Sequence, residues 1–119
     1  GDGVIDTEQK FEGEWIVDPG SHLTFEGDAD ISNASGLTNN GDVDISDINS
    51  DDFRIKHLRG EEDATFTNGT KNIIITDGDG SEYKGLIGPG TGGFTVEQGK
   101  QILSGDNTYT GNTYIADGA

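Results

Sequence analysis

The sequence predicts an all-β protein, because its apolar residues form short clusters separated by residues that favour turns. Residues 15–17, 23–25 and 73–75 are clusters of β-branched, aromatic and other apolar side chains of the kind found in strands. Pairs such as Asn68-Gly69 between the clusters tolerate positive φ at little cost. No window of eleven or more residues repeats apolar groups with the period of a helix. We expect short strands at about 14–17, 22–26, 29–32, 42–46, 53–57, 63–67, 72–76, 82–87, 93–96, 101–104, 107–110 and 113–116.

Composition limits the size of the core and the class of partner. The chain has 119 residues, of which 29% are hydrophobic and 20 are glycine, so we expect one domain with a modest core. Its formal net charge of −16 would repel nucleic acids and anionic membrane surfaces. We therefore expect neither nucleic-acid binding nor direct membrane insertion.

The absence of cysteine excludes disulfides and thiolate metal sites. It fits a surface protein that crosses an oxidising periplasm in the unfolded state. No stretch approaches the ~20 apolar residues that span a bilayer, and no signal peptide opens the chain. If the protein is exported, we expect its targeting signal to lie outside this sequence.

The C-terminal third favours a parallel β-helix, or β-solenoid, over the alternative of an antiparallel β-sandwich. Short strands with threonine and one large apolar residue alternate there with glycine corners, as in residues 85–87, 92–96 and 102–105. The Asn68-Gly69 pair could join two antiparallel strands and keeps the sandwich open on local evidence. A solenoid with turns of about 20–25 residues would give about five turns.

Residues 103–118 read L-S-G-D-N-T-Y-T-G-N-T-Y-I-A-D-G. This stretch resembles the passenger-associated transport repeat of autotransporters, whose pattern is L-S-G-x-N-T-Y-x-G-x-T-x-I/V-x-x-G. The upstream glycine-rich residues 85–95 resemble the segment that precedes that repeat. The resemblance covers about residues 83–119, and the solenoid is extended to residues 1–82 by continuity.

The resemblance implies a right-handed parallel β-helix that forms part of the passenger of a Gram-negative autotransporter. Such a passenger is exported by type V secretion through an outer-membrane barrel of the same polypeptide and lies on the cell surface or is secreted. The implied role is a structural stalk that assists secretion and presents an adhesin, a virulence function, with no enzymatic activity and no cofactor. Implied partners are the flanking solenoid turns, that barrel, and a host-cell or bacterial surface protein or glycan.

Gln101 departs from the repeat family, which usually has leucine at this position. A glutamine that points inward without a partner is costly, so we expect the local pleat to differ.

The charged segment at about 47–63 interrupts the strand rhythm and is expected to be an irregular insertion in which binding residues gather. It carries three of the seven basic residues of the chain. The candidate partner-binding residues are Phe53, Arg54, Lys56, His57 and Arg59.

Two alternative functions remain open. The acidic turn at 77–82 suggests a calcium site through Asp77 and Asp79, which would suit a carbohydrate- or calcium-binding β-sandwich adhesion module. The turn fits neither the EF-hand pattern nor a nonapeptide calcium repeat. The other alternative is a polysaccharide-active β-helix enzyme that uses paired carboxylates. With 23 acidic residues, however, close pairs arise by chance and their spacing is uninformative.

Overall fold

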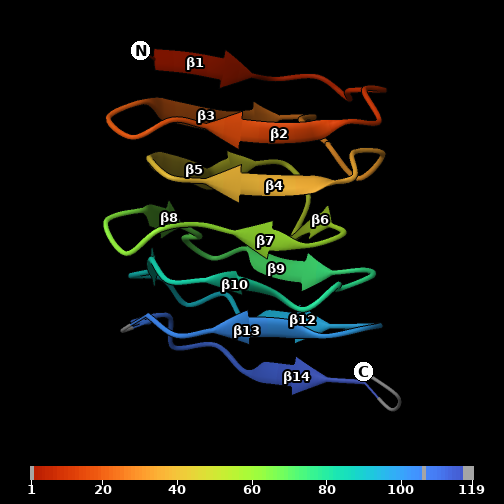
Figure 1. The fold of residues 1–119 in the computed structure, drawn as a ribbon. Coiled ribbons are helices and arrows are strands. Elements are labelled where there is room, and N and C mark those ends of the chain that lie inside the picture. Colours follow the sequence, from red (N-terminus) through yellow and green to blue (C-terminus); the bar gives the residue numbers. More distant parts are fainter. Residues whose placement is uncertain (1, 106, 117–119) are drawn as a thin grey trace.

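The chain forms a right-handed parallel β-solenoid of about six turns. A computed structural model describes residues 2–105 and 107–116, and none of these residues is helical. Every strand pair in this part of the chain is parallel, as the stacked ribbons in Figure 1 show. The predicted β-helix is therefore confirmed, and the antiparallel sandwich is wrong.

The strands form four hydrogen-bonded sheets, which stack into three faces along the solenoid. The first face consists of β1 (Asp2–Ile5), β3 (His22–Gly27), β5 (Asp42–Ile48), β8 (Thr65–Thr67) and β11 (Leu86–Ile87). The second face consists of β2 (Glu14–Val17), β4 (Gly36–Asn39) and β7 (Leu58–Arg59), followed by β10 (Ser81–Tyr83) and β13 (Gln101–Leu103). The third face consists of β6 (Asp52–Ile55), β9 (Asn72–Ile75), β12 (Phe94–Val96) and β14 (Thr113–Ile115).

The register fixes the length of each turn. Phe94 pairs with Thr113, 19 residues further on, and Asp42 pairs with Thr65, 23 residues further on. The other pairings lie between these limits. Because each turn hydrogen-bonds to the next, residues about one turn apart in the sequence become direct neighbours on a face.

Alternating side chains of each strand fill the interior. A column of aromatic rings runs through the interior in the order Trp15, Phe25, Phe53, Phe66 and Tyr83. The distances between successive ring centroids along this column are 6.4, 5.1, 6.1 and 6.5 Å. Most of these contacts are edge-to-face or tilted, which aromatic rings prefer to direct stacking. A small domain with few apolar residues thus obtains a continuous core from a few large rings.

The segment at 47–63 is part of the regular solenoid. It contains β6 and β7, which pair in register with β9 and β4, respectively. The expectation of an irregular insertion is corrected for this reason: Phe53, Ile55 and Leu58 point inward and are buried, and charged residues occupy the outward positions between them. The charged residues that made this segment look irregular are the outward-facing positions of β6 and β7, which alternate with the inward apolar positions.

Gln101 repairs a gap in the second face. Among the described residues, the backbone pairing between the turns of β7 and β10 is limited to an isolated bridge between Gly60 and Tyr83. The Gln101 side chain reaches Leu58, accepting a hydrogen bond from its N–H at 2.9 Å and donating to its carbonyl at 2.7 Å. It also donates to the carbonyl of Ser81 at 3.0 Å. The side-chain amide stands in for a missing peptide group, so the glutamine has its partners and β13 keeps its regular pairing with β10.

Replacing Gln101 with alanine should lower the free energy of unfolding by about 1–3 kcal/mol, since it leaves the part-buried N–H and carbonyl of Leu58 without partners. Hydrogen exchange at the Leu58 amide should accelerate before global unfolding. Gln98→Ala, at an exposed position, is the matched control and should change neither quantity. Unchanged exchange at Leu58 in Gln101→Ala would contradict the repair role.

Candidate functional site

The most organised group of charged side chains lies on the outside of the second face and links strands that are far apart in the sequence. We call it the cross-turn cluster. It consists of Glu14, Thr38, His57, Arg59, Asp79 and Ser81.

The backbone register brings the cluster together. Glu14 pairs with Gly36, and the pairing of Leu37 with Leu58 places Gly36 opposite His57 on the next turn. A Cβ atom at Gly36 would lie 2.1 Å from Nε2 of His57, so only glycine leaves room for the imidazole. The missing side chain lets Glu14 contact His57 across the intervening turn.

His57 is buried, with only 8% of its surface exposed, and it lies between two carboxylates. Its Nε2 is 2.8 Å from Oε1 of Glu14, and its Nδ1 is 3.5 Å from Oδ2 of Asp79. Both ring nitrogens therefore face acceptors. Only the contact with Glu14 is a hydrogen bond, whereas the longer contact with Asp79 is an ion-pair distance.

Arg59 supplies a second positive charge to the cluster. Its Nη2 is 2.8 Å from Oδ2 of Asp79, and its Nε donates to Oγ of Ser81 at 2.7 Å. Its Nη1 lies 3.9 Å from Oε1 of Glu14. Oγ of Ser81 in turn donates to Asp79. The Ser81 hydroxyl is thus held by Arg59 and Asp79, and His57 contacts carboxylates, which is the geometry of a charge network and not of a nucleophile beside its base.

The cluster lowers the pKa of both carboxylates. Burial raises the pKa of Glu14, but the hydrogen bonds from Thr38 and His57 and the charges of His57 and Arg59 outweigh burial and place it below its ordinary value. The hydrogen bond from Ser81 is the largest cause of the lowered pKa of Asp79; burial opposes it, and the charges of His57 and Arg59 assist it. Both groups remain ionised in mild acid.

These shifts predict that acid destabilises the fold through the cluster. Because the folded-state pKa values are depressed, the stabilisation is present above the ordinary carboxylate pKa and is lost as pH falls through the lowered values, beginning below about pH 5. Denaturant titrations should show a shallower loss of unfolding free energy with acid in Glu14→Gln than in the wild type. Glu62→Gln removes an exposed carboxylate and should leave the slope unchanged. Identical slopes in the wild type and Glu14→Gln would contradict the prediction.

The structure separates the five predicted partner-binding residues. Phe53 belongs to the aromatic column at 2% exposure and is not available to a partner, which corrects its proposed role. Arg54 lies on the third face, where its Nη1 is 3.1 Å from Glu97. Lys56 is exposed, whereas His57 and Arg59 belong to the cross-turn cluster on the second face. The five side chains do not form one surface.

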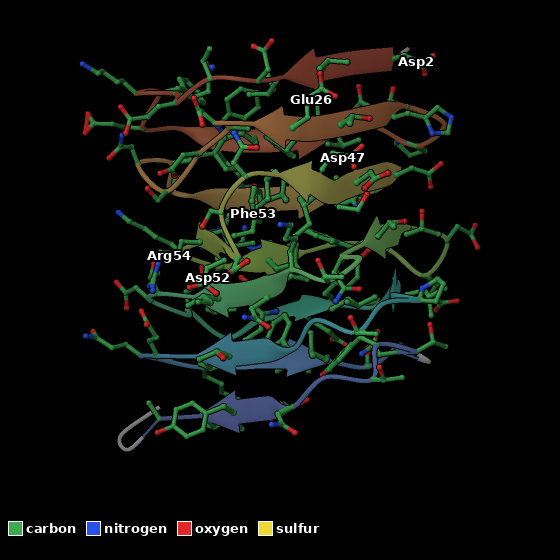
Figure 2. All side chains as sticks on the ribbon, turned by 180° about the vertical axis from the view of Figure 1, so that it is seen from behind. Asp2, Glu26, Asp47, Asp52, Phe53 and Arg54 are labelled. Carbon is green, nitrogen blue, oxygen red and sulfur yellow. The ribbon has the colours of Figure 1, made fainter. Side chains whose placement is uncertain are left out.

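A shallow hollow of about 320 Å³ lies where the third face begins. Figure 2 shows Asp52 and Arg54 at the outer edge of β6 beside it, with Phe53 further in. Each of the three lining carboxylates already accepts a hydrogen bond: Asp28 from Asn49 at 3.0 Å, Asp30 from the Ser32 N–H at 2.7 Å, and Asp52 from Asn72 at 3.1 Å.

The acidic turn does not assemble a cation site with its neighbours. Asp79 is occupied by Ser81 and Arg59, and Asp77 is exposed. Within residues 2–105 and 107–116, no group of three or more histidine, cysteine, aspartate or glutamate side chains is placed to hold a metal ion.

Reasoning from the sequence missed the residues that complete the cluster. Glu14 lies 43 positions before His57, and Thr38 bonds to Glu14 across 24 positions at 2.5 Å. No local pattern relates these residues. A signal was present only in the turn length, because Glu14, Gly36 and His57 recur at intervals close to one turn.

Comparison with known proteins does not assign the chain to a family. No protein-family model matches the chain, and neither the curated proteins nor the solved structures give a match. In the part of the chain that the structure describes, there is no helix of the length and apolarity needed to cross a membrane.

Proposed function

We propose that this chain is a non-enzymatic structural segment of the extracellular passenger of a Gram-negative autotransporter. The segment spaces and presents an adhesive region that recognises a surface protein or glycan, and it assists secretion by folding outside the cell. The observation that carries the proposal is the stack of parallel strands, in which each turn offers a finished template to the next. A stack of this kind is suited to a stalk.

The glycines of the repeat-like stretch support the proposal, because stacking explains them. A Cβ atom at Gly105 would lie 2.0 Å from the carbonyl oxygen of Gly85 on the preceding turn. A Cβ atom at Gly111 would lie 2.4 Å from the carbonyl carbon of Gly92. Asn107, the asparagine of the motif, accepts a hydrogen bond from the Ile87 N–H at 2.9 Å. Motif positions thus coincide with contacts between turns.

The distribution of exposed apolar side chains also supports a segment with neighbours at both ends. The large hydrophobic residues that are more than half exposed among the described residues all lie on the first or last turns. They are Val4, Phe11, Ile16, Tyr114 and Ile115. Ile115 pairs with the buried Val96, and Phe11 packs on Trp15, so adjoining turns of the same polypeptide would cover these two side chains.

The proposal is tested by display on cells. The chain is placed between a signal peptide and an outer-membrane barrel, and the surface fraction is measured by protease treatment of intact cells. We expect display of the wild type and its loss when Gly105 and Gly111 are both changed to valine. Tyr114→Val, at an exposed position, is the control and should be displayed normally. Undiminished display of the double glycine variant, or of a chain lacking residues 83–119, would contradict the proposal.

A further inference from the structure

We infer that the ion pair between Arg54 and Glu97 is a salt-sensitive strap on the third face, which covers Ile74 when it is closed and exposes Ile74 when it opens. The third face therefore has two states, and in the open one Ile74 is an apolar contact point at the surface. This inference concerns the surface of the solenoid and does not depend on the proposed role in secretion.

Ile74 is buried although its side chain points away from the core. Its neighbours in β9, Ile73 and Ile75, are core residues with 0% exposure. Because successive side chains of a strand point to opposite sides, Ile74 faces outward. Its side chain is nevertheless only 6% exposed. A group on the outer surface of the third face must therefore cover it.

The register places Arg54 and Thr95 on either side of Ile74. Arg54 pairs with Ile74 from the preceding turn, and Thr95 pairs with it from the following turn. Threonine is too short to cover an isoleucine. The methylene groups of arginine, by contrast, can lie along an apolar side chain while the guanidinium stays in water. Arg54 is therefore the neighbour that can provide the cover.

Glu97 holds the guanidinium on the far side of Ile74. Nη1 of Arg54 donates to both carboxylate oxygens of Glu97 at 3.1 Å. Glu97 directly follows β12, and its N–H donates to the Ile75 carbonyl at 2.8 Å, so it continues the same ladder of strands. In this sheet β9 lies between β6 and β12. The ion pair thus spans β9, and the stem of Arg54 crosses Ile74 to reach its partner.

The strap is poised to open because its charges lie in water. The side chains of Arg54 and Glu97 are 44% and 41% exposed. At this exposure the paired and separated forms have similar free energies, and dissolved salt screens the attraction. Asp52 provides a second partner on the strand of Arg54 itself, with Oδ2 at 4.0 Å from Nη2, and Figure 2 shows both residues at the outer edge of β6. A guanidinium that leaves Glu97 can therefore move back to Asp52, away from Ile74.

The methyl groups of the isoleucines report the state of the strap without a foreign probe on the protein. Relaxation enhancement by a neutral, soluble paramagnetic agent is measured by NMR on isotopically labelled isoleucine methyl groups. Ile73 and Ile75 serve as references for the core, and Ile16, which is 63% exposed, serves as the reference for the surface. At low salt we expect the enhancement of Ile74 in the wild type to lie close to that of the core references.

Glu97→Gln removes the charge that holds the guanidinium. It should raise the open population, and with it the enhancement at Ile74, about two- to fivefold, the effect of losing one exposed ion pair. Salt at about 1 M, where the Debye length is about 3 Å, should have the same effect on the wild type and little further effect on the variant. Glu62→Gln, which removes an exposed carboxylate elsewhere, is the matched control and should behave as the wild type does.

Several results would overturn the inference. Equal protection of Ile74 in the wild type and in Glu97→Gln would mean that another group covers it. A wild type that salt leaves unchanged, or a variant as sensitive to salt as the wild type, would contradict the ionic origin of the cover. An equal rise at Ile73 and Ile75 would mean that β9 itself opens. The salt series on the wild type needs no substitution, so it decides the question even if the variant fails to fold.

Discussion

Phe53→Ala should lower the free energy of unfolding by about 3–5 kcal/mol, a large share of the roughly 5–15 kcal/mol that stabilises a typical domain. Phe53 lies in the middle of the aromatic column, 5.1 Å from Phe25 and 6.1 Å from Phe66 between ring centroids. Its loss leaves a cavity between the rings of Phe25 and Phe66. Denaturant-induced unfolding followed by circular dichroism measures the effect.

Two further variants separate burial from aromatic character. Phe53→Leu retains much of the volume and should cost less than the alanine variant. Phe11→Ala removes a ring that is 55% exposed and should cost little. A loss below about 1 kcal/mol for Phe53→Ala would show that the column does not carry the core, because surface substitutions alone produce changes of that size.

Asn39→Ala should be the other strongly destabilising substitution, with a loss of about 3 kcal/mol or more. The side chain is fully buried and serves three partners. Its Oδ1 accepts from the Gly41 N–H at 3.0 Å, and its Nδ2 donates to the Thr65 carbonyl at 2.8 Å and to the Tyr83 hydroxyl at 3.2 Å. Alanine leaves all three groups without that partner inside the core.

Tyr83→Phe is the matched control, since it removes only the weakest of these bonds and keeps the ring. It should cost about 0.5–1.5 kcal/mol. Thermal unfolding of the two variants should therefore differ by several degrees. Equal losses would mean that the hydroxyl contact, and not the two backbone contacts, determines the role of Asn39.

The sequence alone predicts those strands whose apolar side chains lie close together along the chain. Residues 22–26, 42–46 and 72–76 were predicted as strands and correspond to β3, β5 and β9, because each has inward apolar side chains within a few residues of one another. The expected strands at 29–32 and 107–110 are present only as isolated bridges at Asp30 and Tyr109. There the chain turns between faces instead of running along one.

β4 escaped prediction for a physical reason. Its inward end is Asn39, a residue type that favours turns, and residues 36–39 are not among the predicted strands. The partners that make a buried asparagine favourable, Thr65 and Tyr83, lie 26 and 44 residues away. The same holds for His57, whose carboxylate partners come from other turns. Local patterns report alternation along one strand, whereas the candidate site depends on which residues are stacked one turn apart.

The direction of the ladder hydrogen bonds has a mechanical consequence. These bonds run along the solenoid axis and join successive turns of 19–23 residues. A force that separates the two ends along this axis loads the bonds of an end turn first and peels it away before the next is strained. Each released turn would add about 60–80 Å of extended chain. The molecule should therefore lengthen under tension in repeated steps of similar size. The number of residues in a turn sets the length of each step, and each step dissipates part of the applied load.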